Sequence, residues 1–171
     1  MAAGKTYEPI ATTTLGSNQN NIEFTSIPAT YTDLVIVFTG SSTNTGSSTN
    51  GMRCRLNSDT ASNYSTTFLN GNGTTASTSR ASSTTYFEAG EIGQTSNTSP
   101  TIAIIHIMNY ANTSIYKSIL ARVSIASSIV QATASLWRST SAINSVTLSR
   151  DFGTNQIKSG STATLYGILA A

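Results

Sequence analysis

The apolar residues of this chain fall in short clusters rich in β-branched and aromatic side chains, separated by stretches of Ser, Thr, Asn and Gly. Clear clusters span residues 33–38, 52–56, 102–108, 116–125, 132–137, 143–148 and 162–169, and weaker ones span 6–14, 22–27, 64–69 and 86–92. Such clusters at roughly 8–12-residue spacing are typical of an all-β sandwich or barrel. The best helix candidate, residues 113–127, is dense in β-branched residues and Ser, which favour strands and turns.

We therefore expect an all-β fold, an antiparallel β-sandwich of about ten strands. In residues 52–56 the alternation predicts that Met52, Cys54 and Leu56 face a core. The run 102–108 is almost continuously apolar, which predicts a central strand covered on both faces. Polar stretches over residues 40–51, 70–85 and 93–100 are expected to be loops, and Asn-Gly pairs within the second favour a tight turn.

Two units of organisation are expected. Residues 1–10 contain Pro and no helix cap, which predicts an extended N-terminal arm. Residues 11–171 then form a single β-sandwich domain, a length at which one core is the usual outcome.

The composition excludes several classes of protein. Only 9% of the 171 residues are charged, against roughly 25% in ordinary soluble proteins, and 27 Ser, 29 Thr and 14 Asn replace them. A net charge of +2 is too weak to favour nucleic acid as a partner. No apolar run approaches the ~18 residues that cross a membrane. The first residues lack the apolar segment of a signal peptide, so we expect synthesis in the cytoplasm.

Few side chains are candidates for catalysis or metal binding. His106 is the only histidine, which excludes a multi-His metal site within one chain; we interpret it as a satisfied histidine within a sheet, with an interface or pH-sensing role as the alternative. Cys54 has no disulfide partner and is expected to be a buried small hydrophobe. Glu88 and Glu91, three apart on a strand, should point to opposite faces, which disfavours a glycosidase pair. We expect neither enzyme activity, cofactor nor metal.

Three aromatic residues are candidates for a contact surface. Trp137, the only tryptophan, ends an alternating strand and is followed by Arg138; such a position favours a core or subunit interface over a sugar platform. Tyr110 and Tyr116 flank a turn at residues 111–115, where either is exposed or packs at the edge of the sandwich.

Several motifs occur in an order that resembles a module common in virion proteins of tailed bacteriophages. They are residues 7–11 (YEPIA) with 15–17 (LGS), 26–35 (SIPATYTDLV), 55–59 (RLNSD) with 63–65 (NYS), 108–112 (MNYAN), 136–139 (LWRS), and 160–162 (GST) with 165–168 (LYGI). The resemblance extends from about Tyr7 to Leu169.

This resemblance implies a β-sandwich on the outer surface of a phage particle, with a jelly roll as the expected strand arrangement. It suggests a capsid decoration (cement) protein that stabilises the head. The alternative is a tail-fibre or baseplate module that binds a receptor or a host surface glycan. The family brings no catalytic residue. A fibre subunit usually adds a shaft or attachment domain, and this chain matches the module alone, which favours the decoration protein.

The expected partners are a second and third copy of the chain, in a homotrimer, and the major capsid protein or other virion proteins. Few charges predict attachment that depends little on salt. The residues expected at the interfaces come from the arm and from the aromatic candidates. They are Lys5, Tyr7, Glu8, Pro9, Ile10, Tyr110, Tyr116, Trp137 and Arg138.

Overall fold

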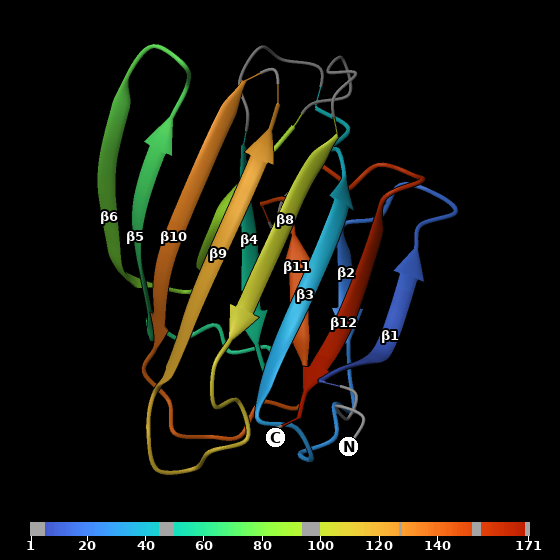
Figure 1. Ribbon diagram of the computed structural model, residues 1–171, viewed down its shortest axis with the longest axis vertical. Coiled ribbons are helices and arrows are strands. Elements are labelled where there is room, and N and C mark those ends of the chain that lie inside the picture. Colours follow the sequence, from blue (N-terminus) through green and yellow to red (C-terminus); the bar gives the residue numbers. More distant parts are fainter. Residues whose placement is uncertain (1–5, 45–49, 94–99, 127, 152–154, 170–171) are drawn as a thin grey trace.

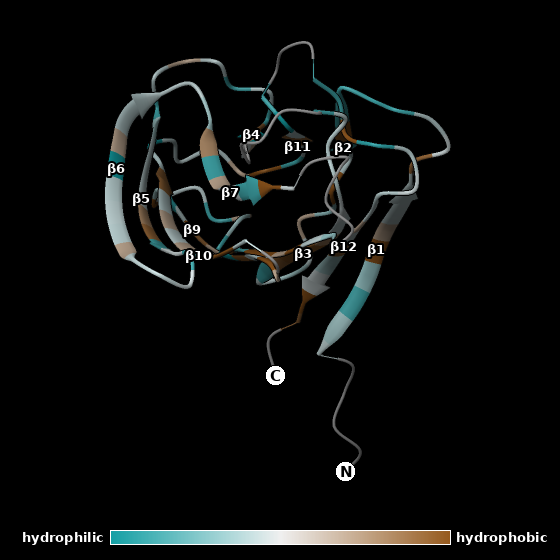
Figure 2. Cartoon of the chain, turned by 90° about the horizontal axis from the view of Figure 1, so that it is seen from above, coloured by the Kyte–Doolittle hydropathy of each residue, from teal (hydrophilic) through white to brown (hydrophobic). Residues whose placement is uncertain are grey.

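The fold is an antiparallel sandwich of two unequal sheets (Figures 1 and 2). The computed structural model describes residues 6–44, 50–93, 100–126, 128–151 and 155–169. Within them lie twelve strands and no helix. The strands are β1 (Tyr7–Thr14), β2 (Asn21–Phe24), β3 (Asp33–Gly40), β4 (Asn50–Leu56), β5 (Tyr64–Gly71), β6 (Ala76–Thr84), β7 (Phe87–Ile92), β8 (Thr101–Ile107), β9 (Lys117–Ile125), β10 (Ile129–Trp137), β11 (Val146–Ser149) and β12 (Thr162–Ile168).

The larger sheet has the order β1-β12-β3-β8-β9-β10-β5-β6, and the smaller one has the order β2-β11-β4-β7. The larger sheet curves, and in Figure 2 its β5 and β6 rise at one side beyond β7. The core lies between the sheets, and the apolar side chains that form it are shielded from solvent. Ile36 and Phe38 of β3 face it from one side, and Cys54 and Leu56 of β4 face it from the other. The predicted all-β sandwich is therefore confirmed.

The strand predictions hold where apolar residues alternate clearly. In β4, Met52, Cys54 and Leu56 are buried while Arg53 and Arg55 are partly exposed, as the pattern predicts. The cluster 143–148 forms a strand only from Val146 onward. The described residues 113–126 of the helix candidate contain no helix: β9 occupies most of them.

The predicted loop over residues 70–85 is wrong in its second half, because β6 extends from Ala76 to Thr84. Nearly every side chain of β6 is exposed, so the sequence of this strand, ASTSRASST, shows no apolar alternation. The turn itself is confirmed. The Asn72 side chain accepts hydrogen bonds from the backbone N–H groups of Thr74 (3.0 Å) and Thr75 (2.8 Å), and Gly73 has a positive φ of 85°.

The predicted N-terminal arm over residues 1–10 is too long. Tyr7, Glu8 and Pro9 pair with Ile168, Gly167 and Tyr166 in β12, because this stretch completes one edge of the larger sheet. The rest of the predicted arm, residues 1–5, lies outside the described residues. A deletion that tests the arm without removing sheet structure must therefore end before Tyr7.

The prediction that residues 102–108 are covered on both faces is also wrong. In β8, Ala103, Ile105 and Ile107 are buried in the core, whereas Ile102 is exposed and Ile104 is partly exposed on the opposite face. A continuous apolar run is compatible with a strand buried on both sides or with one whose outer face is itself apolar. In β8 the second arrangement holds, so the outer face of the larger sheet is itself apolar.

Candidate interaction surface

The outer face of the eight-stranded sheet is built from alternate residues of neighbouring strands. Strand pairing sets these side chains in rows that cross the sheet. The first row runs through Tyr166, Val35, His106, Leu120 and Ala134. The second runs through Thr164, Val37, Ile104, Arg122, Ala132 and Leu69. The third runs through Thr162, Thr39, Ile102, Ser124 and Val130.

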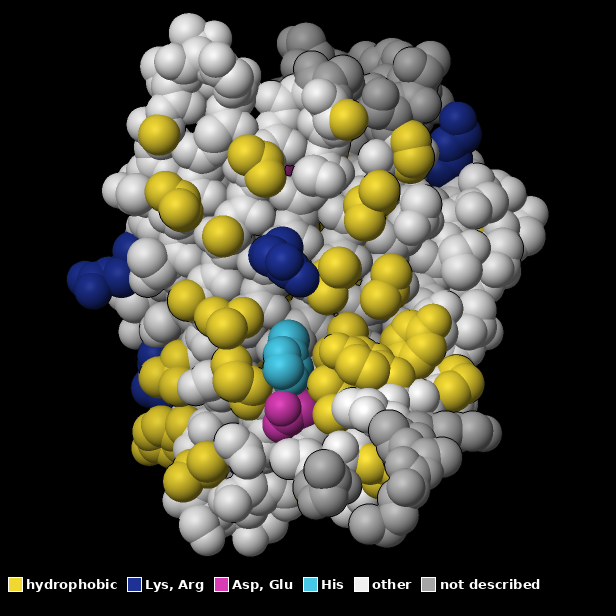
Figure 3. Space-filling model, in the orientation of Figure 1, with side chains coloured by type: hydrophobic (Ala, Val, Ile, Leu, Met, Phe, Trp, Pro, Cys, Tyr) yellow, Lys and Arg dark blue, Asp and Glu magenta, His cyan; other side chains and the backbone are white. Residues whose placement is uncertain are grey.

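These rows make the outer face apolar over much of its width, as the yellow side chains in Figure 3 show. Leu69, Ile102, Leu120 and Val130 are each about half exposed or more. Tyr7 at the sheet edge is also exposed, and its ring meets that of Tyr166 edge-on, 6.2 Å between centroids. An exposed apolar area of this kind, continuous across strands, marks an interaction site more often than scattered single residues do.

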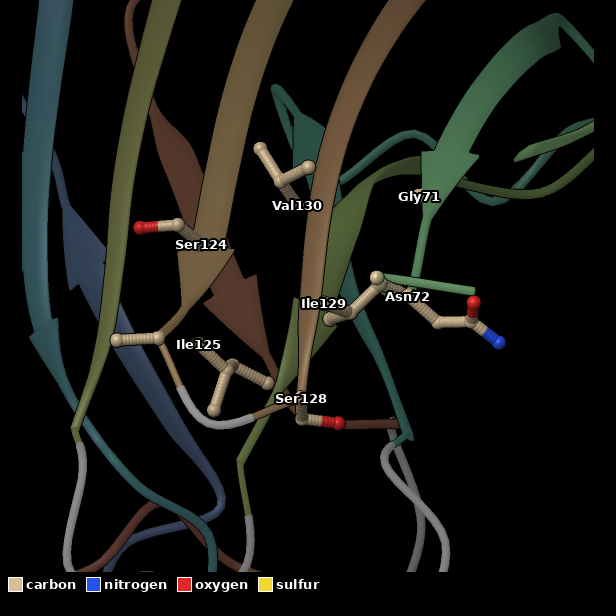
Figure 4. Close-up of a pocket in the computed structure, with 9 residues that line it drawn as sticks. Gly71, Asn72, Ser124, Ile125, Ser128, Ile129 and Val130 are labelled. Carbon is tan, nitrogen blue, oxygen red and sulfur yellow. The ribbon is translucent and has the colours of Figure 1, made fainter. Parts of the chain in front are cut away.

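Three shallow hollows open on this face or at its end. One is lined by Tyr7, Val35, Ile104, His106 and Leu120, among others. A second, almost entirely apolar, lies between Leu69 and Val130 beside Arg122. The third lies where the β9–β10 hairpin meets the β5–β6 turn, and Figure 4 shows Ser124, Val130 and Asn72 around it. The hollows suit protruding side chains of a partner, since none is a deep enclosed pocket.

Three ionisable side chains lie within or beside the apolar rows. His106 Nε2 is 2.9 Å from Asp33 Oδ2, and Asp33 Oδ1 accepts a 2.7 Å hydrogen bond from the backbone N–H of Asn109. Arg122 is exposed one row beyond Leu120. Figure 3 shows blue, cyan and magenta groups close together in the middle part of this face. The interpretation of His106 as a satisfied histidine within a sheet agrees with this contact, although the side chain is 36% exposed.

Both edges of the larger sheet carry features that hinder pairing with another strand. In β1, Pro9 has no N–H to donate, and the pairing register shifts at Ile10. In β6, Arg80 places a charge in mid-strand, and Ser83 forms a bulge with a positive φ of 55°. An incoming strand therefore meets obstacles at both edges of the larger sheet.

The β7 edge of the smaller sheet is closed from within the molecule. Three backbone N–H groups on or just after β7 donate to side chains of the larger sheet: Glu88 to Thr66 Oγ1 (3.2 Å), Glu91 to Gln131 Oε1 (2.6 Å), and Gly93 to Thr101 Oγ1 (2.6 Å). The buried side chains of Thr66, Gln131 and Thr101 thus replace a missing neighbour strand, which gives one role to the many polar uncharged residues.

The outer face of the smaller sheet is polar, and it corrects the prediction for Glu88 and Glu91. Glu88 pairs with Arg53 and Glu91 with Gly51, so both carboxylates lie on the same face. The cause is a bulge between them, at Gly90 with φ 140°, which adds one residue and reverses the alternation.

Burial raises the pKa of both carboxyl groups. Nearby Arg53 partly offsets this effect on the pKa of Glu88, and hydrogen bonding to Gln131 partly offsets it for Glu91. Glycoside hydrolysis uses a pair of carboxyl groups that face one substrate, so two carboxyls on one face are a candidate for such a site. However, neither lines any of the three hollows described above.

The interface residues predicted from the arm differ in whether they are exposed at the surface or engaged in contacts within the fold. Tyr7 and Pro9 are exposed, and their partners in β12 place them beside the outer face. Glu8 accepts a 3.3 Å hydrogen bond from the Tyr31 hydroxyl, and Ile10 packs against the core. Lys5 lies outside the described residues.

The remaining predicted interface residues are mostly structural. Tyr110 and Trp137 are buried, so neither is available as a surface contact in the folded chain. The Tyr110 hydroxyl donates to the Pro28 carbonyl. Arg138 is held by Ser65 Oγ and by the Ser62 carbonyl (2.9 Å). Tyr116 remains exposed, on the loop before β9.

Residues missed by the sequence analysis are those of the outer face itself, such as Leu120, Val130 and Leu69. The available signal was their apolar character at alternate positions opposite the core residues, combined with a scarcity of charges. Cys54, in contrast, is buried as predicted, and burial raises the pKa of its thiol.

Comparison with known proteins finds no matching family model and no curated protein that matches the sequence. Over the described parts of the chain, no group of three or more His, Cys, Asp or Glu side chains is placed to hold a metal ion. The same residues include no helix that is long and apolar enough to cross a membrane.

Proposed function

We propose that this chain is a non-enzymatic structural protein of a tailed-phage virion, a decoration protein on the outer surface of the capsid. The observation that carries the proposal is the exposed apolar outer face of the larger sheet, flanked by edges that hinder strand pairing. A decoration protein stabilises a particle by burying surface against its neighbours, which requires such a face and no chemistry. The order of motifs that resembles phage virion modules supports the same proposal.

A second candidate, a tail-fibre or baseplate module that binds a host glycan, is favoured by two exposed tyrosines. Tyr7 and Tyr116 each present more than half of their surface to solvent. Exposed aromatic rings supply flat apolar surface with a polar tip, which suits sugar rings. The two candidates differ in where on the particle the chain resides.

Immunogold labelling of intact particles of the encoding phage, viewed by electron microscopy, tests the proposal. The decoration protein predicts gold distributed over the head. Gold at the tail tip would overturn it in favour of the second candidate, and a glycan array would then be the next experiment. Unlabelled particles in preparations where the antibody binds the purified chain would overturn both.

A further inference from the structure

We propose that the outer face of the eight-stranded sheet associates with the same face of a second copy of this chain, related by a two-fold axis that passes near His106. The inference deepens the proposed function by naming the partner of the surface on which that function rests. Three features of the molecule support it: the distribution of charge on the face, the size of the face, and the residues at the sheet edges that hinder strand pairing.

The charges of the face are arranged so that the face complements itself. His106 of β8 pairs with Val35 on one side and Leu120 on the other. Asp33 lies two residues before Val35, and Arg122 lies two residues after Leu120. Because β3 and β9 run parallel to each other, Asp33 and Arg122 sit on opposite sides of His106, each one strand and one row away.

A two-fold axis that lies between two stacked faces, above the midpoint of two opposite charges and perpendicular to the line that joins them, places each charge opposite the other charge of the second copy. Here that midpoint is His106, so Arg122 of each copy would face Asp33 of the other. The apolar side chains of the rows would meet one another, with Leu120 and Ile104 near the centre. Two Arg–Asp pairs per dimer then fix the orientation, and the apolar rows supply the larger part of the attraction.

The size of the face is sufficient for a specific interface. The five strands β12, β3, β8, β9 and β10, at ~4.8 Å spacing and with three rows ~7 Å apart, give roughly 500 Å² per copy. A pair would bury about 1,000 Å², close to the least area expected of a specific interface. The edges of the same sheet carry Pro9 and Arg80, which disfavour the alternative of a sheet continued edge to edge.

The first test is the mass of the purified chain by light scattering across a concentration series. The inference predicts twice the 17.9 kDa chain mass. Arg122→Glu should raise the dissociation constant at least tenfold, because it sets like charges against each other, whereas Arg122→Lys should change it little. A monomer at all concentrations, or the homotrimer expected from the resemblance, would overturn the inference.

The position of the axis has a separate test. In a His106→Cys variant the two introduced thiols would lie near the axis, so mild oxidation should produce a covalent dimer on a non-reducing gel. Leu69→Cys, on the same face but far from the axis, is the control and should remain uncrosslinked, as should the wild type with its buried Cys54. Equal crosslinking at both positions would contradict the proposed two-fold axis.

These measurements use the purified chain and are independent of labelling on particles. A monomer that labels phage heads would remove the two-fold pairing and leave the proposed function in place. A face-to-face dimer absent from particles would do the reverse.

Discussion

At the scale of single residues, the carboxylate of Asp59 connects several groups near the end of β10. Asp59 accepts hydrogen bonds from Trp137 Nε1 (2.7 Å), Asn63 Nδ2 (2.9 Å) and the backbone N–H of Ala61 (2.8 Å). The Trp137 ring in turn stacks on Tyr64, with centroids 6.2 Å apart and planes inclined by 16°. The motif that resembles a phage module at residues 55–59 and 63–65 therefore contains a structural hydrogen-bonding centre.

We expect Asp59→Ala to lower the free energy of unfolding by about 2–3 kcal/mol, because it leaves the indole N–H of buried Trp137 without an acceptor. Urea denaturation at neutral pH measures the change. The control is Asp59→Asn, which retains one side-chain oxygen and should cost less. Equal stability of the alanine variant and the wild type would show that the fold does not depend on Asp59.

The same residue predicts a dependence on pH. Burial acts to raise the pKa of Asp59, but hydrogen bonds from Asn63, Trp137 and Ala61 outweigh it and hold the pKa below its ordinary value of 3.8. The stabilisation is therefore complete above that ordinary value and is lost as pH falls through the lower folded-state value. In unfolding measured at successive acidic pH values, Asp59→Asn should lose stability less steeply than the wild type. Parallel curves would contradict this assignment.

At the scale of strands, the bulge in β7 brings Glu88 and Glu91 to one face. Gly90 permits it in two ways: its φ of 140° is rarely adopted by other residues, and a Cβ there would lie 2.6 Å from Val123 Cγ2. Sequence periodicity treats every residue of a strand as one step of the alternation, so it had no means of locating the extra residue.

We expect Gly90→Ala to lower the free energy of unfolding by about 2–4 kcal/mol through backbone strain and contact with Val123. Gly16→Ala is the matched control, because no heavy atom lies within 4 Å of its added methyl group, and its effect should stay within about 0.5 kcal/mol. Chemical denaturation of the two variants measures the difference. Similar values for both would mean that β7 adjusts without cost.

The edge strand β6 could not be predicted from the sequence for a different reason. Its Ser and Thr side chains pack against no core, so neither apolar alternation nor burial distinguishes ASTSRASST from a loop. Pairing with β5 makes it a strand. Only this pairing shows the role of Arg80, whose charge hinders a further strand from adding to the sheet; the sequence alone does not show that role.

Replacing Arg80 with Val should remove this hindrance and increase the population of species larger than the dimer. Light scattering during prolonged incubation measures it, with Arg80→Lys as the variant that keeps the charge. If Arg80→Val remains as well dispersed as Arg80→Lys, the charge is not what limits pairing at this edge.

At the scale of the whole molecule, the two outer faces have different chemistry. The smaller sheet presents Arg53, Arg55, Glu88 and Glu91, while the larger presents rows of Val, Ile, Leu and Ala. The alternation within residues 52–56 was enough to predict the first face and the core behind it. For residues 102–108 the sequence alone did not distinguish a strand covered on both sides from an exposed apolar face, because both have the same pattern.

The proposed decoration role requires attachment through the apolar face, which is tested by the occupancy of face variants on virions. Leu120 on the face is 49% exposed and Ile115 on the loop before β9 is 47% exposed, so Leu120→Asp and Ile115→Asp place the same charge at comparably accessible sites. Quantitative immunoblotting of purified particles should show at least a tenfold loss of the Leu120→Asp chain and nearly unchanged occupancy for Ile115→Asp. Full retention of both variants would contradict the account.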